Sequence, residues 1–185
     1  VTTLTGDSSW LPQFARFTPD IFILSHFLRL TDYPRFLRYL IRSRQFDMVM
    51  ITNSELGYLL LPYLRAHCPE VPFVDYCHME EEQWKNGGYP RLAVEYQYLL
   101  DMNIVSSVHL RHWMQQRGAD PERIQVCYTN VDVKRWQPVS PARRTALRHA
   151  LDVADDTPIL LYAARICEQK QPWVFGQTLL QLRQH

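Results

Sequence analysis

Residues Pro158–Lys170, with the sequence PILLYAARICEQK, carry the pattern on which the fold prediction rests. From Ile159 to Ala164 the residues are almost all apolar, which is typical of a strand covered on both faces in a parallel sheet. Arg165 and Lys170 follow in the connection to a predicted helix. Open α/β sheets bind ligands at the carboxyl ends of their strands, where the amide groups that begin the next helix favour anions. The stretch therefore predicts a buried strand that leads to a phosphate-binding edge. The alternative is that both cations are ordinary solvated charges.

Upstream of this stretch, apolar runs alternate with segments of helical periodicity. The predicted strands are Asp47–Thr52, Val71–Cys77, Asn103–Ser107 and Pro121–Tyr128. The predicted helices are Ser54–His67, Tyr89–Met102, His109–Arg117 and Pro141–Leu151, the last one capped by Ser140. Right-handed crossovers make strands that are connected in this way parallel. The alternation predicts an α/β fold with a Rossmann-like, doubly wound parallel sheet flanked by helices.

Composition excludes some classes of function. Hydrophobic residues make up 46% of the 185 residues, which is enough for a sizeable core. The 20 basic and 19 acidic side chains give a formal charge of +1, so no overall field attracts nucleic acid. No apolar stretch reaches the length of about 18 residues that a membrane-spanning helix needs. Four widely spaced cysteines, with Cys77 and Cys127 in strand-like runs, predict reduced, buried thiols in a cytosolic protein.

One predicted helix, Tyr33–Arg44, has a basic face. Its apolar residues recur at helical spacing, and four arginines face away from them: Arg35, Arg38, Arg42 and Arg44. These arginines either contact phosphates or anionic lipid, or form a solvated helix face.

His78 stands at the carboxyl end of the second predicted strand, where cleft residues of α/β proteins lie. An acidic and glycine-rich loop follows it and contains Glu80, Gly87 and Gly88. Ser106 closes the third strand. Two other interpretations of His78 are a loop histidine with satisfied hydrogen bonds and a metal ligand that acts with Glu80 and Glu82.

The order of these features resembles the retaining glycosyltransferases of the GT-B fold, the family 4-like enzymes also called glycosyl transferases group 1. Arg165, Glu168 and Lys170 after an apolar strand are similar to the family's donor diphosphate loop, although Ala164 and Gln171 stand where the family has glycine. The segment TNVDVKRWQP is similar to the family's interdomain linker. Its matching residues are Asn130, Val131, Asp132, Trp136 and Pro138.

The resemblance implies two Rossmann-like domains. Residues 1–137 correspond to the acceptor-side domain, with a linker at 129–138, and residues 139–185 to the start of the donor-binding domain. In the family, a nucleotide-diphospho sugar lies between these domains and gives its sugar to an acceptor with retention of the anomeric configuration. The resemblance assigns catalytic roles to His78, Arg165 and Lys170, with the two cations on the donor diphosphate. The residues expected to border the cleft or the acceptor are Glu80, Gly87, Gly88, Ser106, Asn130 and Asp132.

The resemblance also implies a nucleotide sugar donor, no metal cofactor, and a saccharide, a lipid-linked molecule or another small molecule as acceptor. The expected location is the cytoplasm, with peripheral contact to the inner face of the membrane as an option. A glycine-rich loop before Val1 and a pair of glutamates after His185 are expected from the family, so we interpret the chain as an interior fragment that is inactive alone. Two alternatives remain open. One is a related enzyme such as a phosphorylase or epimerase, and the other is a non-catalytic module that binds a phosphate or a partner protein.

Overall fold

The computed structural model describes residues 11–182. The chain divides into two compact units, Val1–Asn130 and Val131–His185. The predicted linker at 129–138 includes the boundary between them, and its residues are exposed.

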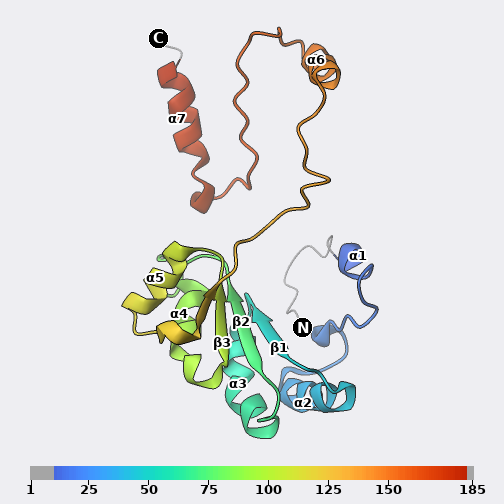
Figure 1. Ribbon diagram of the computed structural model, residues 1–185, viewed down its shortest axis with the longest axis vertical. Helices are drawn as coiled ribbons and strands as arrows, with labels where there is room; N and C mark the ends of the chain where they lie inside the picture. Colours follow the sequence, from blue (N-terminus) through green and yellow to red (C-terminus); the bar gives the residue numbers. More distant parts are fainter. Residues whose placement is uncertain (1–10, 183–185) are drawn as a thin grey trace. The chain divides into compact units, whose positions relative to one another are not determined.

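The first unit is built on a four-stranded parallel sheet. Its strands are β1 (Val49–Thr52), β2 (Phe73–Cys77), β3 (Met102–Val105) and β4 (Ile124–Val126), and they lie side by side in this order (Figure 1). All three pairings are parallel, with Ile51 opposite Asp75 and Asn103 opposite Ile124. The predicted parallel α/β sheet is confirmed, and the four strands predicted upstream of residue 130 each overlap one of the observed strands.

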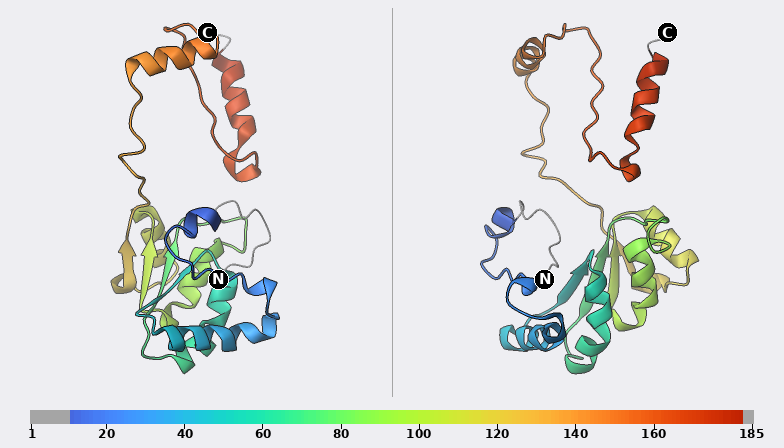
Figure 2. Two further views of the ribbon diagram at one scale, coloured as in Figure 1. Left: turned by 90° about the vertical axis from the view of Figure 1, so that its right-hand side faces the viewer. Right: turned by 180° about the vertical axis from the view of Figure 1, so that it is seen from behind.

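Helices connect consecutive strands and cover one face of the sheet. The crossover helices are α3 (Glu55–His67), α4 (Gly88–Glu95) and α5 (Val108–Gln116), which lie together on the same side in Figures 1 and 2. Helix α2 (Tyr33–Arg44) packs on α3. Shorter elements are α1 (Leu11–Phe14), η1 (Leu24–His26), η2 (Leu30–Asp32), η3 (Gln97–Leu99) and η4 (Pro121–Arg123).

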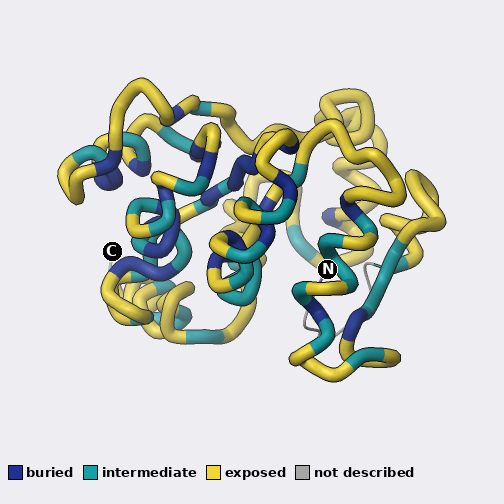
Figure 3. Tube along the Cα trace, turned by 90° about the horizontal axis from the view of Figure 1, so that it is seen from below, coloured by how far each residue is buried: buried dark blue, intermediate teal, exposed yellow. Residues whose placement is uncertain are grey.

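The doubly wound arrangement predicted for this sheet is wrong for the described residues. The strand order follows the sequence without a reversal, so right-handed crossovers place every connecting helix on the same face. The face under the helices forms the core, with Phe73, Val105 and Leu61 fully buried (Figure 3). On the opposite face Met50 and Met102 remain 46% and 40% exposed within the described part of the chain.

Local sequence explains the helix boundaries. The Ser54 side chain accepts a hydrogen bond of 3.0 Å from the Gly57 amide and so caps α3, as predicted for this helix start. Helix α4 ends at Glu95, earlier than the predicted Met102, because the next turn buries Gln97. The Gln97 side chain bonds Asn103 at 2.7 Å and the Asp120 amide at 2.7 Å, which fixes η3 ahead of β3. Continuing the helix would remove these contacts.

The second unit contains α6 (Pro141–Ala150), η5 (Glu168–Lys170) and α7 (Pro172–Leu182). The buried strand predicted at 159–164 is wrong: this segment has no strand pairing, and Leu161 is 82% exposed. A strand needs a neighbour to bond its amide and carbonyl groups, and residues 131–182 contain no strand that could serve as one. The predicted helix after Ser140 is confirmed, and the Ser140 hydroxyl accepts from the Arg143 amide at 3.4 Å.

All four cysteines are free thiols, which confirms the prediction that they form no disulfides. Cys77 is buried as predicted, whereas the burial predicted for Cys127 is wrong. Cys127 lies one residue beyond β4, which is an edge strand of the sheet, and this position leaves its side chain exposed. Among residues 11–182, no helix combines the length and the hydropathy needed to cross a membrane.

Candidate functional site

The structure brings His78 and Ser106 together at the carboxyl edge of the sheet. The Ser106 amide donates to the Cys77 carbonyl at 3.0 Å, which extends the pairing of β2 and β3 by one step. The Ser106 hydroxyl donates to the carbonyl of His78. Ser106 and His78 each follow a strand of the sheet, so the sheet fixes the position of both residues. The backbone of His78 is therefore held at the edge where parallel sheets bind ligands.

Tyr76 supports the ring of His78. The two ring centroids are 4.4 Å apart, and the rings are tilted by 44°. The Tyr76 hydroxyl in turn donates to the Cys127 carbonyl at 3.0 Å and lies 3.2 Å from the Thr129 hydroxyl. The described residues form no hydrogen bond with the ring nitrogens of His78, so this partly buried imidazole can still donate to or accept from a ligand. Tyr76 was not predicted as a site residue, although it lies two residues before His78, a spacing that places both side chains on the same side of an extended chain.

The acidic and glycine-rich loop after His78 is held by pairs of side chains. Glu80 lies 2.7 Å from Nε2 of His109 on α5. Glu82 accepts from the Trp113 indole at 2.8 Å and from Arg117 at 3.2 Å. The carboxylates at 80 and 82 therefore lie against α5, and within residues 11–182 no three potential ligands gather into a metal site. The metal interpretation of His78, Glu80 and Glu82 is not supported by this arrangement.

Gly87 and Gly88 end this loop in backbone conformations that L-residues rarely adopt, with φ of +121° and +64°. A Cβ atom at Gly87 would lie 2.4 Å from the Trp113 ring. The Gly88 amide donates to the Trp84 carbonyl at 2.8 Å. Glycine is needed at Gly87 for its φ angle and for the approach to Trp113, so this residue shapes the loop that follows His78.

Asp75, which sequence analysis did not single out, is fully buried under the helices. Its carboxylate accepts from the Tyr58 hydroxyl at 2.8 Å and from the Asn103 amide at 2.9 Å. Burial raises the pKa of Asp75 to about 6, against the opposing effect of these hydrogen bonds. Burial also raises the pKa of the Tyr58 hydroxyl and of the Cys77 thiol, so both remain proton donors. This network joins α3, β2 and β3 below the carboxyl edge of the sheet.

The predicted diphosphate loop lies in the second unit. Arg165 and Lys170 are exposed, and the Arg165 guanidinium donates to the Gln169 side chain at 3.3 Å. The Tyr162 hydroxyl donates to the Lys170 carbonyl at 2.9 Å, while the Lys170 ammonium has no acceptor among the described residues. Gln171, where the family has glycine, adopts a φ of +48°. The backbone thus keeps a left-handed conformation that glycine would adopt at lower cost.

The last two predicted site residues lie next to the boundary between the units. Asn130 and Asp132 are both exposed. The Asp132 carboxylate accepts from the Lys134 amide at 2.9 Å and from the Arg135 amide at 3.3 Å, which forms a local turn. The structure explains Asp132 by this turn, and Asn130 has no comparable contact with residues 11–182. Roles for both in ligand binding stay predictions.

Comparison with known proteins finds a similar glycosyltransferase sequence and similar structures of Anabaena Alr3699/HepE. A D-inositol 3-phosphate glycosyltransferase from Geodermatophilus obscurus is 40% identical over 62 residues, which are 34% of this chain and 13% of that protein. The crystal structure of Anabaena Alr3699/HepE in complex with UDP-glucose has a TM-score of 0.56 at 18% identity, over 81% of this chain and 41% of that one. The Alr3699/HepE structure with UDP has a TM-score of 0.51 at 18% identity, over 64% and 32%. The matched regions span less than half of each of these relatives.

The family comparison covers more of the sequence. The family described as Glycosyltransferase Family 4 matches residues 1–135, which include the whole sheet, His78 and its supporting residues. The structural neighbours agree with a GT-B-like fold. Because the match extends over well more than half of its length, the chain belongs to Glycosyltransferase Family 4.

Proposed function

We propose that this chain is part of an enzyme that transfers a sugar from a nucleotide-diphospho sugar to an acceptor with retention of the anomeric configuration. The observation that carries the proposal is the position of His78. Ser106 and Tyr76 hold this residue at the carboxyl edge of the sheet, where parallel sheets bind ligands. The sheet lies within the residues that match the glycosyltransferase family. The similar structures of Anabaena Alr3699/HepE are complexes with UDP and with UDP-glucose, which supports a donor of this class.

The chemical requirement of the reaction is charge stabilisation. As the bond between sugar and diphosphate breaks, positive charge develops on the sugar and negative charge on the diphosphate. Cations beside the diphosphate bind the transition state more strongly than the ground state and so accelerate transfer. We assign this role to Arg165, whose guanidinium can bind two phosphate oxygens, and to Lys170, whose ammonium is a mobile point charge. With two cations in place, the proposed reaction needs no metal ion.

His78 is assigned to the donor sugar. Its ring is packed against Tyr76 while its nitrogens keep their hydrogen-bonding capacity, so the side chain can bond a sugar hydroxyl without losing a protein contact. Glu80, Gly87 and Gly88 act indirectly in this proposal, because Glu80 pairs with His109 and the glycines shape the loop. The acceptor, the cytoplasmic location and contact with the inner face of a membrane stay predictions.

The test compares variants of the protein that contains this chain, with donor binding and transfer measured for a panel of nucleotide sugars. His78→Ala should lower kcat/KM at least about tenfold, the usual effect of losing one hydrogen bond to a reacting group. Arg165→Ala should lower kcat by roughly 10²- to 10³-fold, as when one oxyanion donor is lost. His112→Ala is the matched control, because His112 is exposed on α5 and is not assigned to the site. Unchanged kinetics for both His78→Ala and Arg165→Ala would refute the assigned roles.

A further inference from the structure

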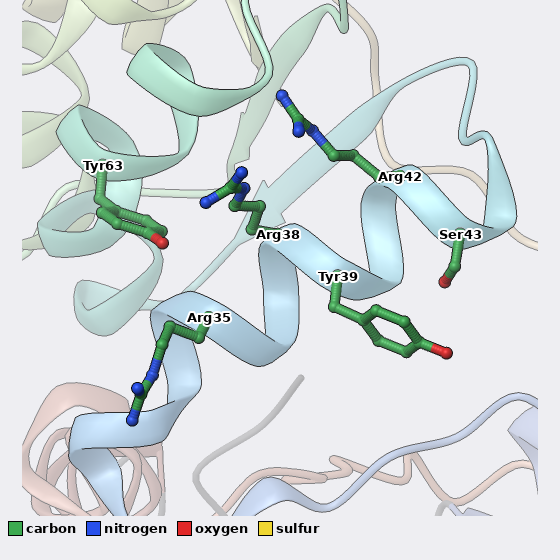
Figure 4. Close-up of a pocket in the computed structure, with 6 residues that line it drawn as sticks. All are labelled: Arg35, Arg38, Tyr39, Arg42, Ser43 and Tyr63. Carbon is green, nitrogen blue, oxygen red and sulfur yellow. The ribbon is translucent and has the colours of Figure 1, made fainter.

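A concavity of the first unit lies between α2 and α3. Its volume is about 520 Å³. The lining side chains are three arginines, two tyrosines and a serine: Arg35, Arg38, Tyr39, Arg42, Ser43 and Tyr63 (Figure 4). We call this concavity the arginine pocket. None of these six side chains is acidic, so every formal charge among the lining residues is positive.

The three arginines differ in the partners that their guanidinium groups already have. Arg35 pairs with Asp32 at 2.6 Å, but its side chain is 75% exposed, so water weakens this pair. Arg42 donates to the carbonyl of His67 at 2.5 Å, a neutral acceptor at the end of α3. The guanidinium of Arg38 has no acceptor among residues 11–182 and extends from α2 toward the Tyr63 ring of α3 (Figure 4). The pocket therefore has an excess of positive charge, with Arg38 at its centre.

We propose that the arginine pocket binds a phosphate group. Arginine presents a planar fork of N–H donors that matches two phosphate oxygens, and the hydroxyl of Tyr63 adds a further donor. The alternative is a solvated basic helix face. In that case the arginines would only need to point into water, whereas here Arg38 extends toward Tyr63 of a second helix, and both line one concave space together with Arg35 and Arg42 (Figure 4). A phosphate bound there would offset the repulsion between three neighbouring cations.

The phosphate group can belong to a soluble molecule or to the headgroup of an anionic phospholipid, and two probes distinguish these sources. Inorganic pyrophosphate, followed by titration calorimetry, reports soluble phosphate. Sedimentation with vesicles of phosphatidylglycerol, compared with vesicles of phosphatidylcholine, reports a lipid headgroup. Arg165→Ala/Lys170→Ala is measured in parallel, because those two residues are the diphosphate site of the proposed function. Pyrophosphate that still binds this double variant is bound elsewhere.

Whichever of the two probes binds the unaltered protein, Arg38→Ala should weaken its binding about tenfold. Arg38→Lys should weaken binding less, because the positive charge remains. Arg144→Ala on α6 is the matched control, since it removes an exposed arginine outside the pocket and should change binding less than twofold. Loss of pyrophosphate binding in Arg38→Ala supports a soluble ligand, and loss of vesicle binding supports a lipid. Equal effects of Arg38→Ala and Arg144→Ala, or no binding of either probe to the unaltered protein, would overturn the proposal.

Discussion

Changing Asp75 to asparagine is expected to remove a pH-dependent loss of stability from the first unit. Asparagine has the same shape, and its carbonyl can accept from Asn103 as the carboxylate does. Its amide can donate to the Tyr58 oxygen, which can then donate to the Cys77 sulfur 3.6 Å away. The variant therefore keeps the buried network but carries no ionisable group at this position.

The sign of the effect follows from the raised pKa of Asp75. Its value of about 6 in the folded chain lies above the ordinary value of 3.8, so the folded state holds the proton more tightly than the unfolded state. The stabilising contribution of the protonated group is complete below pH 3.8 and is lost as the pH rises through 6. Because one pKa unit corresponds to ~1.4 kcal/mol, about 2–3 kcal/mol should be lost between roughly pH 4 and pH 7.

The assay is urea unfolding of the chain and of Asp75→Asn across this pH range, followed by circular dichroism. The free energy of unfolding of Asp75→Asn, minus that of the unaltered chain, should rise by about 2–3 kcal/mol from low to neutral pH. Asp156→Asn, at an exposed position, should show a constant difference. A difference for Asp75→Asn that is also independent of pH would show that the buried carboxyl titrates normally, and the argument from burial would fail.

Two further substitutions test the loop and the helix start. Gly87→Ala should destabilise the chain by about 1–3 kcal/mol more than Gly118→Ala, because both positions have positive φ but only the first new methyl group would meet Trp113. Equal losses in thermal unfolding would contradict this contact. Ser54→Ala should lower the free energy of unfolding by about 1 kcal/mol, since the Gly57 amide loses its acceptor. Denaturant titration measures this loss, and an unchanged midpoint would show that the cap contributes nothing.

The first unit was largely predictable from sequence, because its signals are local. The boundaries of α2 follow from the spacing of apolar residues and from Pro34 in its first turn. The start of α3 follows from Ser54. The position of His78 after β2 follows from the apolar run of residues 71–77. These patterns depend on a few neighbouring residues and needed no tertiary information.

Other features depend on contacts between distant segments. The run at 159–164 has the composition of a buried strand but lacks a pairing partner among the described residues, and composition does not reveal this. The connecting helices share one face of the sheet because the strands lie in sequence order. The spatial order of strands cannot be read from the periodicity of apolar residues. Asp75 resembled an ordinary polar residue until Tyr58 and Asn103, 17 and 28 residues away, were placed beside it. The partners of Glu80 and Glu82 on α5 could not be predicted either, because they lie about 30 residues away in the sequence.

The most direct test of the proposed function is the anomeric configuration of the product. The protein that contains this chain is incubated with a panel of nucleotide-diphospho sugars and candidate acceptors, and the product of the first donor consumed is examined by NMR spectroscopy. The account predicts the same configuration at the anomeric carbon in product and donor, and strongly reduced product formation by Arg165→Ala. An inverted configuration, or transfer that is insensitive to both His78→Ala and Arg165→Ala, would contradict it.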